Sequence, residues 1–468
     1  MRAPVPRSEG VSYWLREALE ADPGDPRPPL RGDATADVVV LGGGYAGLWT
    51  AWFLTERAPG IRVAVLERNI CGWGASGRNG GFAGGWWDDA ADLAARYGDQ
   101  AALEACRAAE ASVEAIGEWC RANGVDAWYR PVAYLEVASS PAQDGAWTAS
   151  VEACRRMGVP GGYREISAEE VRSVCRSPVL RAGAVMRGAT VQPARLARGL
   201  RRVLLQRGVR IYEGTPAMRM EARGGVRVQT PAGTVRAGRA ILCLNAWSAG
   251  WPGLRRSLVV RGSYMLVTAP APQKLEELGW TGGECICDAR TALHYFRTTP
   301  DGRIAIGGVG RARGLRVGPD YDYDERSLGW VRDGFHRIFP SFRDVPIEEG
   351  WGGPVDVSGT HHPWFGTAGP GTVHYAVGFT GNGVAPAHLA GRILAALATG
   401  ADDPVTDLPM VNREPKRFPP RPLTAVGTSV VQAAILRKDR LEDAGRRPGA
   451  LTRFLAGLPR RLGYSLGS

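Results

Sequence analysis

The sequence predicts an α/β fold of two domains, one built on a parallel sheet and one, of α+β type, on an antiparallel sheet. The β-branched run Val38–Val40 leads into the glycine-rich segment Gly42–Gly47, which an apolar stretch of helical character follows. Further along, Tyr264–Thr268 and Leu293–Ile306 alternate or run apolar around a turn at 300–302, as antiparallel strands do. The first pattern predicts a Rossmann-like nucleotide-binding domain, and the second an antiparallel-sheet domain inserted into it.

The first glycine segment has the spacing of a dinucleotide cradle. Gly42 permits a tight turn, Gly44 lets the backbone approach a pyrophosphate, and Gly47 lets the helix pack closely on the strand. Glu67 ends the second strand, where its carboxylate can accept hydrogen bonds from a ribose. The neighbours expected to border the same ligand are Tyr45, Ala46 and Arg68.

A second glycine-rich segment, Gly72–Phe82, follows the second strand. It is too rich in glycine to pack a core, and its many backbone N–H groups suit a ligand or a turn. We expect Ser76 and Asn79 to supply side-chain hydrogen bonds and Arg78 a charge. The other residues of this loop that we expect against the cofactor are Gly74, Ala75, Gly80 and Gly81.

These two segments resemble those of the D-amino acid oxidase superfamily of FAD-dependent amine oxidoreductases, most of all the branch with glycine oxidase, sarcosine oxidase and γ-glutamylputrescine oxidoreductase. Val191–Leu196 resembles the opening of the helix before the third Rossmann strand. Ile241–Trp247 resembles the strand that ends beside the flavin, and Gly378–Val384 the C-terminal flavin loop. The resemblance runs from about Ala36 to about Gly400, nearly the whole folded body.

The resemblance implies an FAD-dependent oxidoreductase that acts on a small-molecule amine. Hydride passes from the α-carbon of the uncharged amine to flavin N5, and water hydrolyses the resulting imine. The protein then has to position the C–H bond and to stabilise negative charge near the pyrimidine end of the ring with backbone N–H groups. The further residues implied in FAD binding are Ala217, Asn245, Ala246, Gly353, Gly381, Asn382, Gly383 and Val384.

Two departures from the relatives concern the cofactor. Sarcosine oxidase-like proteins attach the flavin to a cysteine shortly before the C-terminal loop, whereas the matching stretch here is Trp351–Pro354, without a cysteine. The resemblance therefore predicts non-covalent FAD. The strand Arg303–Gly307 lacks the lysine that assists oxygen in those relatives, so the electron acceptor is either O₂ or another molecule.

A third departure concerns the substrate. Glycine oxidase-like enzymes grip the α-carboxylate with an arginine at the position that matches Val355 here. The missing clamp favours an amine without an α-carboxylate. Asp356 is then a candidate for holding a distal ammonium, although a cap of the turn before Ser358 is an equal alternative.

Other candidates for the substrate pocket are weaker. They are four aromatic or histidine side chains, of which three lie on strands expected to face the flavin: Tyr264, His294, Tyr295 and Trp351. The adjacent His361 and His362 precede a proline and are expected to be a surface pair.

Three functions remain open at this point. A γ-glutamylputrescine oxidoreductase-like enzyme is the leading hypothesis. A D-amino acid or glycine oxidase-type enzyme is the second, and it predicts that an arginine such as Arg297 or Arg261 reaches the pocket. The third is a flavin-binding subunit without turnover of its own.

The interleaving of these signals predicts a discontinuous organisation. The inserted domain should begin with a helix over Ala101–Trp119. The proline-rich N-terminus should be a strap that Trp14 pins to the body. The expected pieces are residues 1–35 for the strap, 36–90, 181–260 and 345–402 for the FAD-binding domain, 91–180 and 261–344 for the substrate domain, and 403–468 for a C-terminal tail with helices.

Composition limits the remaining classes of function. No apolar run is long enough to span a membrane and the N-terminus has no signal-like segment, so a soluble cytoplasmic protein is expected. The formal charge of +11 is spread along the chain, which argues against nucleic acid as a partner. The eight scattered cysteines should be buried and unpaired, and no metal site is expected. The oligomeric state stays open.

Overall fold

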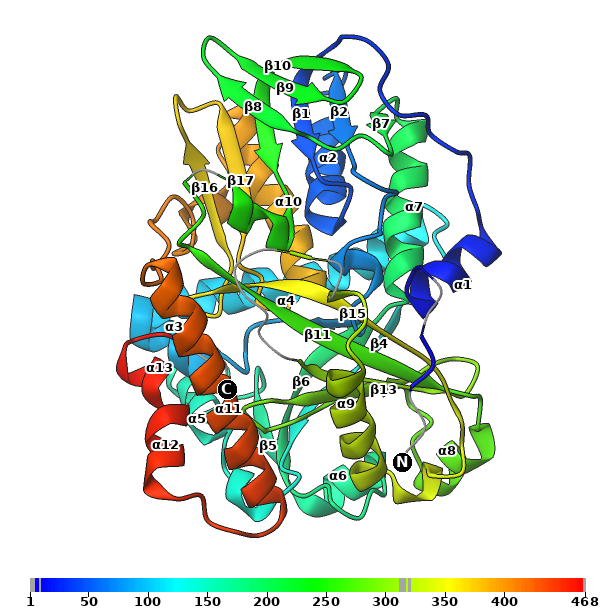
Figure 1. Cartoon of the computed structure of the whole chain (residues 1–468), viewed down its shortest axis with the longest axis vertical. Helices are drawn as coiled ribbons and strands as arrows, with labels where there is room; N and C mark the ends of the chain where they lie inside the picture. The colour runs from blue at the N-terminus through cyan, green and yellow to red at the C-terminus, as the bar shows by residue number, and fades with distance from the viewer. Residues whose placement is uncertain (1–4, 8–9, 252, 311–316, 319–320, 466–468) are drawn as a thin grey trace.

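The computed structural model describes residues 5–7, 10–251, 253–310, 317–318 and 321–465, and the fold is built on two large sheets (Figure 1). The first sheet has the order β16-β17-β10-β1-β2-β7, with β9 beside β10 and β8 beside β9. Its strands are β1 (Ala34–Leu41), β2 (Val63–Leu66), β7 (Arg210–Tyr212), β8 (Arg219–Ala222), β9 (Val226–Thr230), β10 (Gly233–Leu242), β16 (Trp364–Ala368) and β17 (Val373–Val377).

The first sheet is the predicted nucleotide-binding sheet. Strands β7, β2, β1, β10 and β17 pair in parallel. Val38, Val39 and Val40 in β1 are almost completely buried, as expected for a parallel strand covered on both faces. The helices α2 (Tyr45–Arg57) and α10 (Val384–Thr399) pack against each other, and α7 (Pro193–Gln206) packs on α2. The α/β class and the Rossmann-like architecture predicted for the first domain are therefore confirmed.

The second sheet has the order β15-β11-β14-β13-β12-β4-β6-β3, with β5 beside β6. Its strands are β3 (Phe82–Gly84), β4 (Arg130–Val137), β5 (Arg164–Ile166), β6 (Gly183–Thr190), β11 (Leu258–Thr268), β12 (Cys285–Asp288), β13 (His294–Thr298), β14 (Ile304–Val309) and β15 (Ile347–Ser358). The pairs are antiparallel except β12 with β4. The antiparallel strands predicted around the turn at 300–302 are confirmed.

The remaining helices are the strap helix α1 and the helices of the inserted and C-terminal segments. The predicted helix over Ala101–Trp119 is confirmed as part of α4. The bounds are α1 (Tyr13–Ala21), α3 (Ala90–Tyr97), α4 (Asp99–Ala122), α5 (Thr148–Arg156), α6 (Ala168–Val174), α8 (Pro272–Leu278), α9 (Glu325–Ile338), α11 (Arg421–Asp443), α12 (Ala450–Ala456) and α13 (Leu458–Arg461).

Three strands lie in a different sheet from the one that the sequence predicts. β3, β6 and β15 fall within segments expected for the FAD-binding domain, yet all three belong to the second sheet. β6 pairs along its whole length with β4, and β15 pairs with β11 from residue 347 to residue 358. These long antiparallel ladders decide which sheet the strands join, although the strands lie near the nucleotide-binding motifs in the sequence. Pairing in a ladder satisfies the backbone donors and acceptors of a buried strand.

The N-terminal strap is pinned to the body by Trp14, as predicted, although its helix α1 was not predicted. Trp14 is completely buried, and its carbonyl accepts a hydrogen bond of 2.7 Å from Gln192 Nε2. Glu17 adds an ion pair with Arg195, and the Ser12 hydroxyl caps α1 at Leu15 N. The strap thus ties α1 to α7, which carries part of the nucleotide-binding domain.

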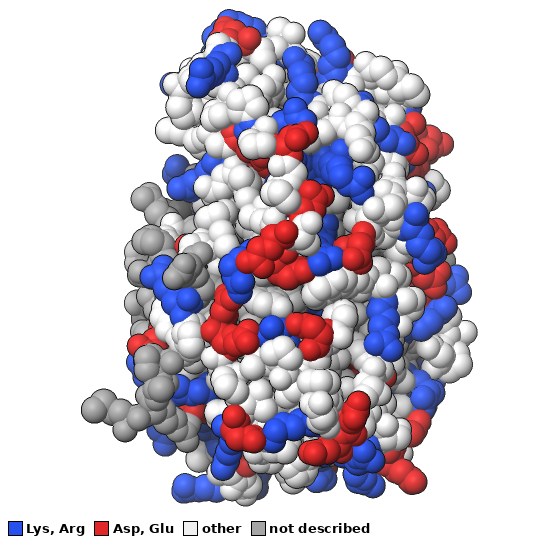
Figure 2. Space-filling view, turned by 90° about the vertical axis from the view of Figure 1, so that its right-hand side faces the viewer, with Lys and Arg blue, Asp and Glu red and all other residues white. Residues whose placement is uncertain are grey.

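The C-terminal tail folds back onto the second domain, and α11 lies to the left of α9 in the view of Figure 1. Ile435 of α11 is buried against Ala292, and Gln432 Nε2 donates to Gly310 O. On the face shown in Figure 2, basic and acidic side chains are interleaved. That face carries no continuous basic patch of the kind that polyanions need. None of the helices within the described ranges has the length and apolar character to span a bilayer.

Candidate functional site

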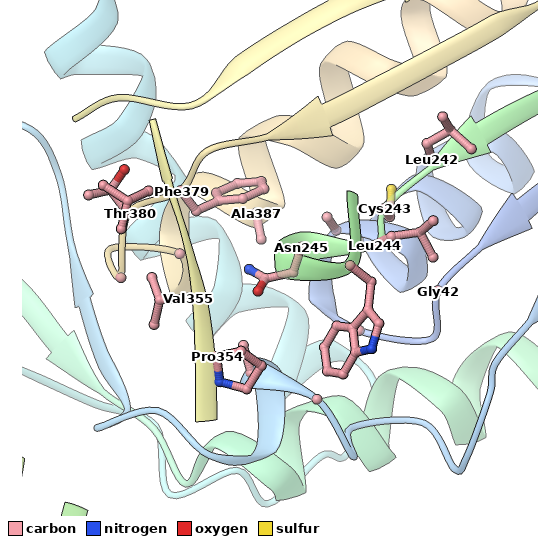
Figure 3. Close-up of a pocket in the computed structure, with 18 of the residues that line it drawn as sticks. Gly42, Leu242, Cys243, Leu244, Asn245, Pro354, Val355, Phe379, Thr380 and Ala387 are labelled. Atoms are coloured by element: carbon pink, nitrogen blue, oxygen red, sulfur yellow. The ribbon is translucent and has the colours of Figure 1, made fainter. Parts of the chain in front are cut away.

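A cavity of about 1500 Å³ lies where the two sheets meet. Gly42, Leu242 and Tyr375 line it from the first sheet, and Ser263 and Pro354 line it from the second. Figure 3 shows Asn245, Phe379 and Thr380 around it, together with Pro354 and Val355 of β15. Because one cavity joins the nucleotide motifs to the antiparallel sheet, a bound cofactor and a substrate can meet in it.

The glycine cradle has the backbone geometry that the sequence predicts. Gly42 has φ +110°, a conformation that favours glycine. A Cβ at Gly47 would lie 2.0 Å from Gly42 O, so only glycine lets α2 pack on β1. Gly44 caps α2 without a side-chain hydrogen bond and lines the cavity. The turn and the close packing are confirmed, and the contact of Gly44 with a pyrophosphate stays a prediction.

Glu67 lies at the edge of the cavity, at the end of β2. Its Oε2 accepts a hydrogen bond of 2.7 Å from Gly43 N, and its Oε1 accepts one of 2.8 Å from Asn69 N. Burial raises the pKa of this carboxyl, while the two N–H donors oppose that rise. The carboxylate is thereby fixed in place with lone pairs left for ribose hydroxyls.

In the second glycine loop, the polar side chains that were expected to face a ligand form hydrogen bonds and an ion pair within the protein. Ser76 Oγ accepts from Tyr45 N at 2.8 Å, which joins the loop to the start of α2. Asn79 donates to Ala75 O and accepts from Gly81 N, so its amide closes the loop itself. The charge of Arg78 is neutralised by Asp322 at 2.8 Å. Arg78 thus shares its charge with a protein carboxylate, because burial demands a partner for a guanidinium, and its contact with the cofactor stays a prediction.

Asp356 lies outside the cavity, so its predicted contact with a distal ammonium is wrong. It is completely buried, its Oδ1 accepts from Asn245 Nδ2 at 3.0 Å, and its Oδ2 accepts from Gly378 N at 2.5 Å. Burial raises the pKa of Asp356 to about 7. Its neighbours Val355 and Val357 line the cavity, since alternate residues of β15 face opposite sides. Asp356 instead holds together two loops of the cofactor side.

Most residues predicted to bind FAD line the cavity. The ones that do are Gly42, Gly44, Tyr45, Ala46, Glu67, Arg68, Gly74, Ala75, Ser76, Arg78, Asn79, Gly80, Ala217, Asn245, Gly353, Gly381, Asn382, Gly383 and Val384. Gly47, Gly81 and Ala246 lie behind its wall. Gly81 has φ +73° and a Cβ there would lie 2.1 Å from Val191 O, so it serves the chain path instead of a ligand.

The cavity fits a flavin dinucleotide on three observations. The N-termini of α2 and α10 both border it, and their N-cap residues are glycines without a capping side chain. Tyr45 N of α2 is bonded to Ser76 Oγ, but the N–H groups that follow it and the first N–H of α10 can meet negative charge. The glycine cradle leaves room for a pyrophosphate beside α2. The cavity is lined by residues of both sheets, with Arg68 after β2 of the first sheet and Tyr295 in β13 of the second.

Of the four predicted pocket side chains, only Tyr295 lines the cavity. Its hydroxyl lies 2.9 Å from Ser263 Oγ, and burial raises its pKa to about 12. The phenol therefore stays protonated at neutral pH. With Ser263, it offers a neutral hydrogen-bonding pair on the wall of the second sheet.

The other three pocket predictions are wrong, because these side chains belong to packed interiors. Tyr264 is buried beneath the sheet, in a space that glycines at 262, 310 and 352 leave for its ring. His294 is buried against Trp330 and lies 2.9 Å from Asp288 Oδ2. Trp351 donates to Arg78 O at 2.9 Å from a buried position.

The histidine pair is not on the surface, so that prediction is wrong too. His361 lines the cavity, and the buried His362 places Nε2 3.4 Å from Asp89 Oδ2. Asp88 and Asp89 both line the cavity and were missed by the sequence analysis. The only signal for them is an adjacent acidic pair that ends the apolar stretch 82–87.

Of the two arginines predicted as candidates for the substrate pocket, Arg261 lines the cavity. Arg297 does not, because it is buried and donates to Val191 O at 2.8 Å. Arg261 of β11 lies directly opposite Val355 in the register with β15. Cross-strand partners share one face of a sheet, so Arg261 and Val355 stand side by side on the wall of the cavity.

Glu136 of β4 lies near Asp88 and gives a pH-dependent prediction. Tyr163 donates to its Oε2, and burial raises the pKa of this carboxyl from 4.5 to about 7. Between those values the folded protein holds a proton that the unfolded chain releases, so stability from this group falls as pH rises. We expect the melting temperature of Glu136→Gln, relative to that of the wild type, to increase between pH 4.5 and pH 7.5. The corresponding gain in the relative free energy of unfolding is at most about 1.4 kcal/mol per pH unit. A constant difference between the two proteins across that range would contradict the raised pKa.

The cysteines at the cavity support non-covalent FAD. All eight cysteines are buried and unpaired, as predicted. Cys243 and Cys287 line the cavity, and burial raises the pKa of Cys243 to about 12 and that of Cys287 well above its ordinary range. A thiol that stays protonated does not attack a flavin. We expect acid precipitation to leave all yellow colour in the supernatant as intact FAD, and flavin in the protein pellet would contradict this.

Comparison with known proteins agrees with this geometry. Residues 37–397 match the sequence model of the family described as FAD dependent oxidoreductase. The chain is 30% identical over 405 residues to the probable oxidoreductase OrdL of Rhizobium meliloti, covering 84% of this chain and 90% of that protein. It is 30% identical over 397 residues to γ-glutamylputrescine oxidoreductase of Escherichia coli, covering 83% of this chain and 89% of that one.

Solved structures share the fold. Glycine oxidase from Geobacillus kaustophilus matches with a TM-score of 0.65 at 18% identity, over 81% of this chain and all of that one. L-proline dehydrogenase from P. horikoshii matches with a TM-score of 0.64 at 21% identity, over 81% of this chain and 97% of that one. The cradle, the cavity and the match over 37–397 lead to one conclusion: this chain is an enzyme of the D-amino acid oxidase (DAO) family of FAD-dependent oxidoreductases.

Proposed function

We propose that this enzyme oxidises the C–N bond of an amine, with chemistry like that of γ-glutamylputrescine oxidoreductase. The observation that carries the proposal is the single cavity that joins the FAD cradle to the wall formed by Ser263, Tyr295 and Arg261. The E. coli relative of that name supports it, since the alignment covers most of both chains.

Bound FAD supplies the two-electron acceptor, and water hydrolyses the imine product to a carbonyl compound and ammonia. The chain's own part is to hold a neutral amine. Tyr295 and Ser263, 2.9 Å apart, offer a hydroxyl pair that can accept from the amine N–H without becoming charged. The buried surroundings exclude water and disfavour the ammonium form, which cannot give up a hydride from its α-carbon.

A second candidate is an amino acid oxidase-type reaction, and Arg261 is the observation that favours it. A guanidinium in the cavity suits a carboxylate. In this alternative the carboxylate sits on the carbon that is oxidised, whereas in the first it lies far from the reacting amine.

Anaerobic flavin reduction tests both. We expect mono-acylated diamines to bleach the flavin absorbance of the holoenzyme rapidly, and D-amino acids, glycine and sarcosine to do so slowly. Faster bleaching by an α-amino acid would move the assignment to the amino acid oxidase type. Bleaching by dithionite but by none of the amines or amino acids would indicate a flavin-binding subunit without turnover.

A further inference from the structure

We propose that the cavity recognises the end of the substrate remote from the reacting amine as a zwitterion, with Arg261 holding a carboxylate and Asp88 holding an ammonium. The inference rests on the proposed function and names the substrate class more closely. Its basis is that a guanidinium and a carboxyl group line one cavity and that neither has an ion-pair partner among the described residues.

Arg261 has no partner among the described residues. No hydrogen bond or ion pair joins it to any of them, and its Nε is buried without an acceptor. Burial lowers the pKa of Arg261 to about 10, with only the distant pull of Asp439 against it. A guanidinium still carries its proton at neutral pH under these conditions, so a carboxylate ligand would complete a site that the protein leaves open.

Asp88 is the opposite case. It lines the cavity, and its Oδ1 accepts only from its neighbour Asp89 N, at 3.2 Å. Burial, and after it the acidic neighbours Asp89 and Glu136, raise the pKa of Asp88 well above the ordinary range, which favours the protonated carboxyl as long as no cation is near. Asp89 differs, because His362 pairs with it at 3.4 Å. A cationic ligand would supply the counter-charge that Asp88 lacks.

Asp88 and Arg261 line the same cavity as His361. Asp89, the neighbour of Asp88, and Arg261 act on the pKa of His361 with opposite signs. Yet Arg261 forms no ion pair within 4.0 Å with Asp88 or Asp89. A guanidinium and a carboxyl group that share one cavity without pairing suit a ligand that carries both a carboxylate and an ammonium, such as an amino acid head group.

Arg261 also explains the valine at position 355. The register between β11 and β15 puts Arg261 and Val355 side by side on the cavity face. The cationic side chain stands on β11 and not at position 355 of β15. The carboxylate that it binds therefore need not belong to the carbon that is oxidised. Asp88, on another segment, provides the second charge.

Four amines that share the same reacting end, the free amine of the putrescine chain, test the proposal in the holoenzyme under anaerobic conditions. The first is γ-glutamylputrescine, the second lacks its α-carboxylate, the third lacks its α-ammonium, and the fourth, N-acetylputrescine, lacks both. We expect each missing charge to raise the apparent dissociation constant for flavin reduction by about 10- to 100-fold. The limiting rate of reduction should change little.

Two variants assign the charges. Arg261→Met should weaken only the two compounds with the carboxylate, and Asp88→Asn only the two with the ammonium. Arg261→Lys should give a smaller loss of apparent affinity, confined to the carboxylate compounds. This variant provides the test if Arg261→Met loses its flavin. Matched controls are Arg227→Met and Asp402→Asn, exposed positions outside the cavity, which should behave as the wild type.

The possible failures can be told apart. Equal reduction of all four amines by the wild type, or an equal loss on all four in both Arg261 variants, would overturn the zwitterion site while leaving amine oxidation intact. Absence of reduction by every amine would instead overturn the proposed function itself.

Discussion

Gly44→Val purifies as a folded protein with little or no FAD. Gly44 caps α2 at the edge of the cavity, where the backbone has to approach the pyrophosphate. A Cβ there lies 2.9 Å from Ser76 Oγ, the atom that accepts from Tyr45 N, so a branched side chain both fills the cradle and displaces the second glycine loop. The ratio of flavin absorbance to protein absorbance after purification measures the effect.

Gly427→Val is the matched control. Gly427 lies in α11, far along the chain from the cradle, and a Cβ there meets nothing within 4 Å. This variant should keep full flavin content. Circular dichroism of both variants shows whether the chain is folded, and a folded Gly44→Val protein with normal flavin content would show that the cradle is placed wrongly.

Asp356→Ala loses affinity for FAD and slows every amine to the same relative extent. Removing the carboxylate leaves Asn245 Nδ2 and Gly378 N without their acceptor, and each buried donor left unpaired costs about 1–3 kcal/mol. Both donors belong to segments that line the cavity on the cofactor side. We therefore expect the dissociation constant of FAD to rise at least about tenfold, measured by flavin fluorescence on dilution.

The pattern across substrates separates this role from a substrate contact. If Asp356 bound a distal ammonium, its loss would weaken diamines and spare a monoamine without a second charge. Asp356→Asn retains one acceptor oxygen and should recover part of the FAD affinity. Selective loss of diamine reduction with normal FAD affinity would contradict the position of Asp356 behind the cavity wall.

Motifs in which the backbone itself performs the function could be predicted from the sequence. The conformation of Gly42, the close approach at Gly47 and the position of Glu67 follow from local chain geometry and the order of strand, turn and helix. The free N-terminus of α10 at the C-terminal loop follows in the same way. Such features depend on neighbours in sequence, so a linear pattern contains them.

Side chains of the substrate wall could not be predicted, because their direction depends on strand register. On β15, the alternation of the strand turns Asp356 inward and Val355 toward the cavity, and a shift by one residue would reverse them. Tyr264 and His294 likewise fill the interior of the second domain. The sequence also did not predict that the C-terminal tail reaches the cavity, which residues 412–415 and 417 line.

The sequence by itself determined the cofactor, the parallel sheet and the cradle, since glycine spacing and β-branched runs act locally and admit few alternatives. Only the tertiary structure decided which charges meet the substrate. Arg261 and Val355 become neighbours through pairing of strands almost a hundred residues apart, and Asp88 joins them from a third segment. A contact between such distant segments depends on how the two sheets close around the cavity, and local sequence patterns do not encode that closure.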